Sequence, residues 1–123
     1  MQIVRELIER YLPGHSNEFI IEAIPPENGH DTYELDTSDG KIILRGNNAG
    51  SVSAALGWYI KYTMNANISW CGKRIPVFEK GKLPMPKPYR RVIEQEFRVY
   101  MNYCTHSYSA AWWNWDRWEY EID

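Results

Sequence analysis

The sequence that decides the fold stands at the end of the chain and reads Arg98-Val-Tyr-Met-Asn-Tyr-Cys-Thr-His-Ser-Tyr-Ser-Ala-Ala-Trp-Trp-Asn-Trp-Asp-Arg-Trp-Glu-Tyr-Glu-Ile-Asp123. At its start, Val99 and Met101 alternate with Arg98 and Tyr100, which is the period of a strand with two different faces. Five small polar side chains then crowd into one corner: Asn102, Cys104, Thr105, Ser107 and Ser109. The stretch therefore predicts a short strand that runs into a polar corner.

An aromatic helix is predicted to follow this corner. Trp112, Trp115, Trp118 and Ile122 recur at helical spacing, so one face of the helix is almost wholly apolar. Because such a face seeks burial, we expect the chain to be part of a larger protein that covers it. For the chain by itself, we expect residues 94–123 to swap, pair or cap the sheet edge and so to fold differently than in the larger protein.

The preceding sequence predicts a small α+β unit. Helices are expected over residues 2–12 and 52–63, and strands over residues 19–24, 32–36, 41–45 and 68–71. Asp39-Gly40 is a preferred pair for a tight hairpin turn, because both central residues need φ above zero. The continuous apolar run 42–44 indicates a central strand. The expected fold class is an α/β sandwich, a small mixed or antiparallel sheet with two helices on one face.

A linker is expected over residues 73–93, because prolines there stiffen the chain and remove ladder hydrogen bonds. These prolines, interspersed with lysines, are Pro76, Pro84, Pro86 and Pro88. The predicted organisation is an N-terminal domain over residues 1–72, the linker, and a second unit over residues 94–123. Upstream, Gly46-Asn47-Asn48 is interpreted as a turn that caps the second helix, since it lacks the pattern of a phosphate loop.

Composition excludes several classes of partner. The formal net charge of −2 gives no electrostatic case for nucleic acid, and no apolar run approaches the length of a membrane span. Cys71 and Cys104 lack a metal-site spacing and are expected to be free thiols. The three histidines are scattered, so no metal-binding cluster is predicted. Residues 1–5 do not resemble the start of a signal peptide.

The motifs 102–109 and 112–123 closely resemble the α-N-acetylglucosaminidase family of glycoside hydrolases, over about the last quarter of the chain. The segment Arg45-Gly-Asn-Asn-Ala-Gly50 and the order of elements are similar, more weakly, to the family's N-terminal domain. The resemblance implies that residues 94–102 form the first strand of a (β/α)8 catalytic barrel and residues 110–123 its first helix. It also implies retaining hydrolysis of terminal α-linked N-acetylglucosamine without a cofactor. The compartment stays open, with export of the parent protein the favoured interpretation.

The resemblance implies that Asn102 and Cys104 line the pocket of the terminal sugar, at the strand end where barrel enzymes place their active sites. The alternative is that both residues only shape a turn. None of the acidic residues Glu94, Glu96, Asp116, Glu119 and Glu121 has a sequence argument for being one of the two carboxylates that glycoside hydrolysis needs. The family's catalytic glutamates lie on later strands. No catalytic residue is therefore assigned, and this chain alone is expected to be inactive.

Two other functions remain open. The chain is a non-catalytic carbohydrate-binding module if Trp112, Trp113 or Trp115 forms a platform for a sugar. It is an interaction domain if the aromatic segment docks on a partner or on a second copy of the chain. The expected partners are thus the rest of the parent catalytic domain, an N-acetylglucosaminyl glycan in the intact enzyme, and a second copy through the aromatic tail.

Overall fold

The computed structural model describes residues 2–69, 72–99 and 110–122. Three α-helices, one 3-10 turn and one π-helical turn accompany six strands in these ranges. The helical elements are α1 (Gln2–Tyr11), η1 (Ser16–Glu18), α2 (Ala49–Trp58), η2 (Tyr59–Thr63) and α3 (Trp115–Ile122). The strands are β1 (Phe19–Ala23), β2 (Asp31–Ser38), β3 (Lys41–Gly46), β4 (Asn67–Ser69), β5 (Gly72–Arg74) and β6 (Tyr89–Ile93).

The main sheet is mixed and has the order β1-β3-β2-β6. β1 runs parallel to β3, whereas β2 is antiparallel to both β3 and β6. The hairpin turn between β2 and β3 is confirmed, with φ of 50° at Asp39 and 73° at Gly40. β3 lies inside the sheet, as its continuous apolar run predicts. The α+β fold class with a mixed sheet is therefore confirmed.

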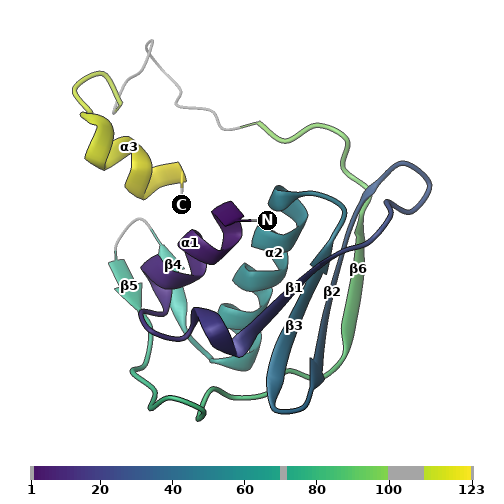
Figure 1. Cartoon of the computed structure of the whole chain (residues 1–123). Coiled ribbons are helices and arrows are strands. Elements are labelled where there is room, and N and C mark those ends of the chain that lie inside the picture. Colours follow the sequence, from purple (N-terminus) through teal and green to yellow (C-terminus); the bar gives the residue numbers. More distant parts are fainter. Residues whose placement is uncertain (1, 70–71, 100–109, 123) are drawn as a thin grey trace.

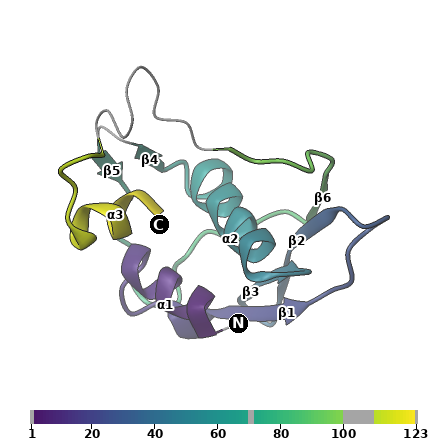
Figure 2. The ribbon, with the colours of Figure 1, turned by 90° about the horizontal axis from the view of Figure 1, so that it is seen from above.

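Helices α1 and α2 cover one face of this sheet, as Figure 1 and the view from above in Figure 2 show together. Alternate strand residues point toward the helices and fill the space between the two layers. Small residues on α2 allow it to approach the sheet closely. The largest side chains buried there are Tyr59, Phe19, Ile8, Leu35, Ile42, Leu44 and Leu56. The N-terminal part of the chain thus has a core of its own.

The start of α2 is the point where helix and sheet come closest. A methyl group on Gly46 would lie 2.8 Å from both the backbone nitrogen and Cγ2 of Val52, so the end of β3 accepts no side chain. Asn48 caps the helix, because its side chain accepts a hydrogen bond from the amide of Ser51 at 2.8 Å. The capping turn expected from the sequence is therefore confirmed.

The opposite face of the sheet carries a network of charges. Arg45 on β3 reaches Glu22 on β1 at 2.6 Å and Asp36 on β2 at 3.1 Å. Hydrogen bonds to Glu22 and then to Asp36 raise the pKa of Arg45. Arg90 on β6 pairs with Glu34 on β2. Ion pairs thus join all four strands on the face that α1 and α2 do not cover.

The segment expected as a linker contributes two strands. β5 pairs with β4 in a separate hairpin, and β6 adds an edge to the main sheet beside β2. Between them, Leu83 is buried and the hydroxyl of Tyr59 donates to the carbonyl of Pro84 at 3.0 Å. The expectation of an extended linker over residues 73–93 is wrong at residues 89–93, because the last proline of the segment is residue 88 and the backbone after it is free to pair.

The C-terminal helix starts later than the sequence predicts. α3 begins at Trp115, and Asn114 accepts a hydrogen bond from the amide of Arg117 at 3.0 Å, as a helix cap does. The expected first strand, residues 94–102, shows no strand over its described part, residues 94–99. Within the ranges that the structure describes, no helix is long and apolar enough to cross a membrane.

Candidate functional site

The predicted sugar-binding residues, Asn102 and Cys104, lie outside the described residues, as do both cysteine thiols. The structure does describe the chain on either side of this corner. Arg98 lies before the corner and α3 lies after it. Both flanks contact the N-terminal unit. The contact made by Arg98 is called the entry anchor, and the contact made by α3 is called the exit anchor.

The entry anchor is an ion pair between Arg98 and Asp31. Nη1 of Arg98 lies 2.7 Å from Oδ2 of Asp31. The other carboxylate oxygen of Asp31 accepts hydrogen bonds from the side-chain Nδ2 of Asn47 at 2.9 Å and of Asn48 at 2.7 Å. Hydrogen bonds from the side chains of Asn47, which has the larger effect, and Arg98 hold the pKa of Asp31 below its ordinary value. A carboxylate that stays ionised therefore holds the chain just before the corner.

Asn47 and Asn48 fix the entry anchor to the sheet and to α2. Oδ1 of Asn47 accepts hydrogen bonds from the amide of Thr32 at 2.9 Å and from the hydroxyl of Ser51 at 2.7 Å. Both asparagines thus donate from the side-chain nitrogen to Asp31, while their side-chain oxygens accept from Thr32 and Ser51. The sequence indicated the capping role of this turn but not its contact with Asp31, because that contact depends on the register of β2 against β3.

The exit anchor joins α3 to α1 and to the β4–β5 hairpin, which lie beside it in Figures 1 and 2. Nζ of Lys73 lies 4.5 Å from the ring centre of Tyr11 and 4.6 Å from that of Tyr120. The hydroxyl of Tyr120 also lies 3.5 Å from the carbonyl oxygen of Ser69. No sequence motif signals these contacts, because their members are far apart in the chain.

One of the acidic residues near the corner, Glu121, is held in an ion pair within α3. Glu121 lies 3.2 Å from Arg117 one helical turn away, at the spacing typical of ion pairs along a helix. The guanidinium of Arg117 also lies 4.7 Å from the ring centre of Trp113 and 4.9 Å from that of Tyr120. Among the described residues, no group of three or more histidine, cysteine or acidic side chains is arranged to hold a metal ion.

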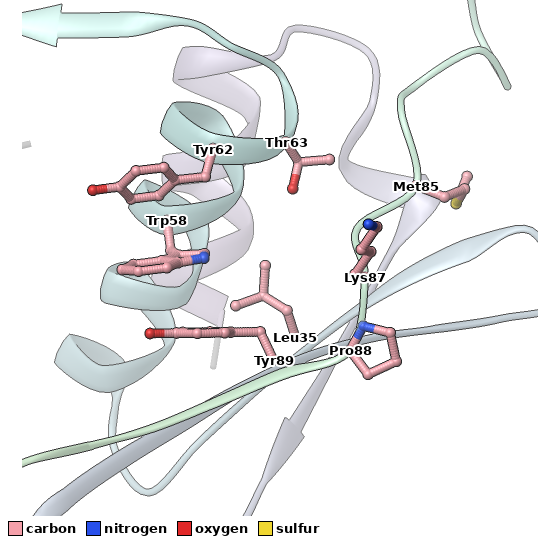
Figure 3. A pocket seen from close by; sticks show the side chains of 8 residues that line it. All are labelled: Leu35, Trp58, Tyr62, Thr63, Met85, Lys87, Pro88 and Tyr89. Carbon is pink, nitrogen blue, oxygen red and sulfur yellow. The ribbon is translucent and has the colours of Figure 1, made fainter.

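A second candidate site is a cavity of about 560 Å³ between the end of α2 and the segment 85–89, shown in Figure 3. Three aromatic rings form a column along its edge. Trp58 stacks on Tyr89 with ring centres 4.2 Å apart and 9° between the planes, and Tyr62 lies 4.2 Å from Trp58 on a tilt of 42°. Lys61 lies over Tyr62 at 5.2 Å.

This column offers few ring faces to a ligand. The faces of Trp58 pack against neighbouring rings, so the cavity is bordered by ring edges instead. Sugar stacking needs an open ring face, and the cavity therefore does not favour a carbohydrate platform at this place. The aromatic column instead fastens β6 to the end of α2, through the stacking of Trp58 on Tyr89.

Solved structures that resemble this chain define its class. It superposes on a family 89 glycoside hydrolase from Clostridium perfringens in complex with PUGNAc, with a TM-score of 0.87 and 27% identity over 98% of this chain and 14% of that one. The same values hold for a doubly substituted form of that enzyme in complex with its substrate, GlcNAc-α-1,4-galactose. The fold is that of part of a glycoside hydrolase. The expectation that residues 94–123 fold differently in this chain than in the larger protein stays a prediction.

Sequence comparisons then give the family. The model of the α-N-acetylglucosaminidase N-terminal domain matches residues 2–85, and that of the family's TIM-barrel domain matches residues 98–123. Human α-N-acetylglucosaminidase is 32% identical over 98% of this chain. This chain belongs to the α-N-acetylglucosaminidase family, as its C-terminal motifs predict. It spans 17% of the human relative's length.

Proposed function

We propose that this chain is the N-terminal domain and the opening of the catalytic barrel of an enzyme that removes terminal α-linked N-acetylglucosamine with retention. The observation that carries the proposal is the match of two consecutive family models, domain and barrel, to one chain. The solved relative in complex with GlcNAc-α-1,4-galactose supports a glycan substrate. The two carboxylates of a retaining mechanism are proposed to lie beyond residue 123.

In this proposal the small domain supports the barrel, and the corner after Arg98 contributes to the sugar pocket. Asn102 offers both a donor and an acceptor to the hydroxyl groups of N-acetylglucosamine. Cys104 packs against the sugar ring and takes no part in covalent chemistry. The ionised Asp31 and its two asparagine partners hold the start of this corner through Arg98.

A hydrolysis assay with a chromogenic α-N-acetylglucosaminide tests the proposal. It is run on this chain and on a version extended through the whole barrel. We expect activity only in the extended version. Activity in the 123-residue chain would place the catalytic acids within it, with Glu94, Glu96 and Asp116 to be tested first. The absence of hydrolysis by both the 123-residue chain and the extended version would contradict the proposed activity.

Two substitutions in the extended protein test the sugar-binding residues. Asn102→Ala is expected to lower kcat/KM about 10- to 100-fold, because sugar hydroxyls lose their partner in a site where water is displaced. Cys104→Ser keeps nearly the same volume and is expected to retain most activity. Complete loss in Cys104→Ser with retention in Asn102→Ala would reverse the proposed roles.

An interaction surface on the aromatic segment is a second candidate function. Trp112 is 95% exposed and Trp115 is 67% exposed, and large exposed apolar groups favour association. Sedimentation over a wide concentration range tests this function. Association that disappears on removal of residues 94–123 would support it, and a monomer at all concentrations would contradict it. A carbohydrate-binding module would instead bind free glycans through Trp112 in the absence of catalysis.

A further inference from the structure

Lys73 occupies an unusual position between two aromatic rings from distant parts of the chain. Its ammonium lies 4.5 Å from the ring centre of Tyr11, at the end of α1, and 4.6 Å from that of Tyr120, in α3. Both distances lie within the range of a cation–π contact, which is about 6 Å. One cation therefore contacts two rings at the same time.

The three residues join the two units of the chain. Tyr11 and Lys73 lie in the segment that matches the N-terminal domain of the family, whereas Tyr120 lies in the segment that matches the barrel. α3 has no fully buried residue over Trp115–Ile122, so apolar burial holds it less firmly than α1 and α2. Its contacts with the N-terminal unit include those of Tyr120 with Lys73 and Ser69.

We propose that Lys73 is a positioning residue that latches the first barrel helix to the N-terminal domain. The name "Lys73 latch" refers to Tyr11, Lys73 and Tyr120. A lysine suits this place because its ammonium stays partly hydrated at the surface while its flexible stem reaches both rings. The latch itself stands on geometry alone. Its consequence for the sugar pocket rests on the proposed function, because α3 follows the corner that contains Asn102 and Cys104.

Hydrogen exchange on the whole chain tests the latch without any need for activity. Lys73→Met keeps an unbranched side chain and removes the charge. We expect the amides of α3 to exchange about 2- to 5-fold faster in this variant, since the exposed cation–π contact between Lys73 and Tyr120 supplies a ratio of that size. Lys73→Arg keeps the cation and should restore protection. The amides of β2 and β3 should not change in either variant.

Lys61→Met is the matched control. Lys61 also lies over a ring, that of Tyr62 at 5.2 Å, but this contact joins neighbouring residues of η2. Its loss should leave α3 protection unchanged. Equal exchange of α3 in Lys73→Met and in the parent chain would overturn the proposal. Faster exchange throughout the chain would overturn it as well, because a latch acts on α3 alone.

Kinetics of the barrel-extended protein separate this inference from the proposed function. There, Lys73→Met should raise KM about 3- to 10-fold with a smaller change in kcat, and Lys73→Arg should restore KM. If the extended protein has no activity, the proposed function fails while hydrogen exchange still decides the latch. Unchanged KM together with faster exchange of α3 would contradict the positioning role and leave Lys73 a purely structural contact.

Discussion

The two ends of this chain use aromatic and apolar side chains in opposite ways. In the N-terminal unit, residues 2–93, Tyr59 and Phe19 are buried and meet edge to face at 5.6 Å inside a closed core. In α3, no residue is buried, and Trp115 and Ile122 are 67% and 70% exposed. The comparison shows that apolar composition alone does not make a core. The sheet and two helices supply the second layer that α3 lacks.

The largest expected effect comes from removing a side chain of this core. Leu44→Ala should lower the free energy of unfolding by about 2–5 kcal/mol, because Leu44 is fully buried on the central strand and its loss leaves a cavity. Trp115→Ala is the matched variant in the exposed helix and should change it by less than about 0.5 kcal/mol. Denaturant unfolding measures both. Equal effects would break the comparison between the two regions.

Close packing of the N-terminal unit is tested by adding a methyl group. Gly46→Ala should destabilise the protein by about 1–3 kcal/mol, because the new Cβ meets the backbone of Val52 at 2.8 Å. Gly57→Ala, on α2 with open space around it, should stabilise the protein by up to about 1 kcal/mol. Thermal unfolding compares the two variants. A neutral Gly46→Ala would show that helix and sheet are less tightly packed than the distances indicate.

The buried hydroxyl of Tyr59 predicts a loss of stability in alkali. Burial raises the pKa of Tyr59 above its ordinary value, so the folded state retains a proton that the unfolded state releases. The stability that depends on this proton is complete below about pH 10 and falls as the pH rises further. Unfolding measured from pH 8 to 11 should show this slope. It should decrease in Tyr59→Phe and remain in Ile60→Val, a variant that weakens the core but keeps the tyrosine.

The smallest expected effect concerns the ion pair at the boundary of the two regions. A double-mutant cycle of Asp31→Asn and Arg98→Met should give a coupling of about 0.2–1 kcal/mol, because Arg98 is 54% exposed and the pair is screened by water. Asp31 has a lowered pKa in the folded state. Its contribution is therefore present at neutral pH and lost as the pH falls through that lowered value. A coupling of zero at pH 7 would show that the ion pair of Asp31 and Arg98 does not anchor the chain.

Local signals in the sequence predicted much of the N-terminal fold. The Asp39-Gly40 turn, the interior position of β3 and the Asn48 cap all depend on residues close together in the chain, and all three are confirmed. The sequence does not predict β6, because the four prolines before it indicate an extended segment without ladder hydrogen bonds. Its residues Tyr89–Ile93 follow the last of these prolines and occupy an edge, where charged side chains such as Arg90 are tolerated.

The contacts around the candidate site could not be predicted in the same way. Asp31 lies 16 residues from Asn47 and meets it only because β2 and β3 pair in one register. Lys73 and Tyr120 meet only through the arrangement of two units along the chain. The motif that identifies the family predicts which residues face the sugar, Asn102 and Cys104, but not what holds them. The sugar-binding roles of Asn102 and Cys104 stay predictions.

The two outer strands of the sheet bear on how this chain is made in the cell. An unpaired strand edge invites pairing with another unfinished chain, and both edges here are short. Pro25 and Pro26 follow β1, and Pro86 and Pro88 precede β6, which itself carries Arg90 and Arg91. Domains fold one after another during synthesis, beginning at the N-terminus. A chain that has folded through residue 93 during synthesis therefore presents blunted strand edges to other unfinished chains, and we expect this to lower its tendency to aggregate.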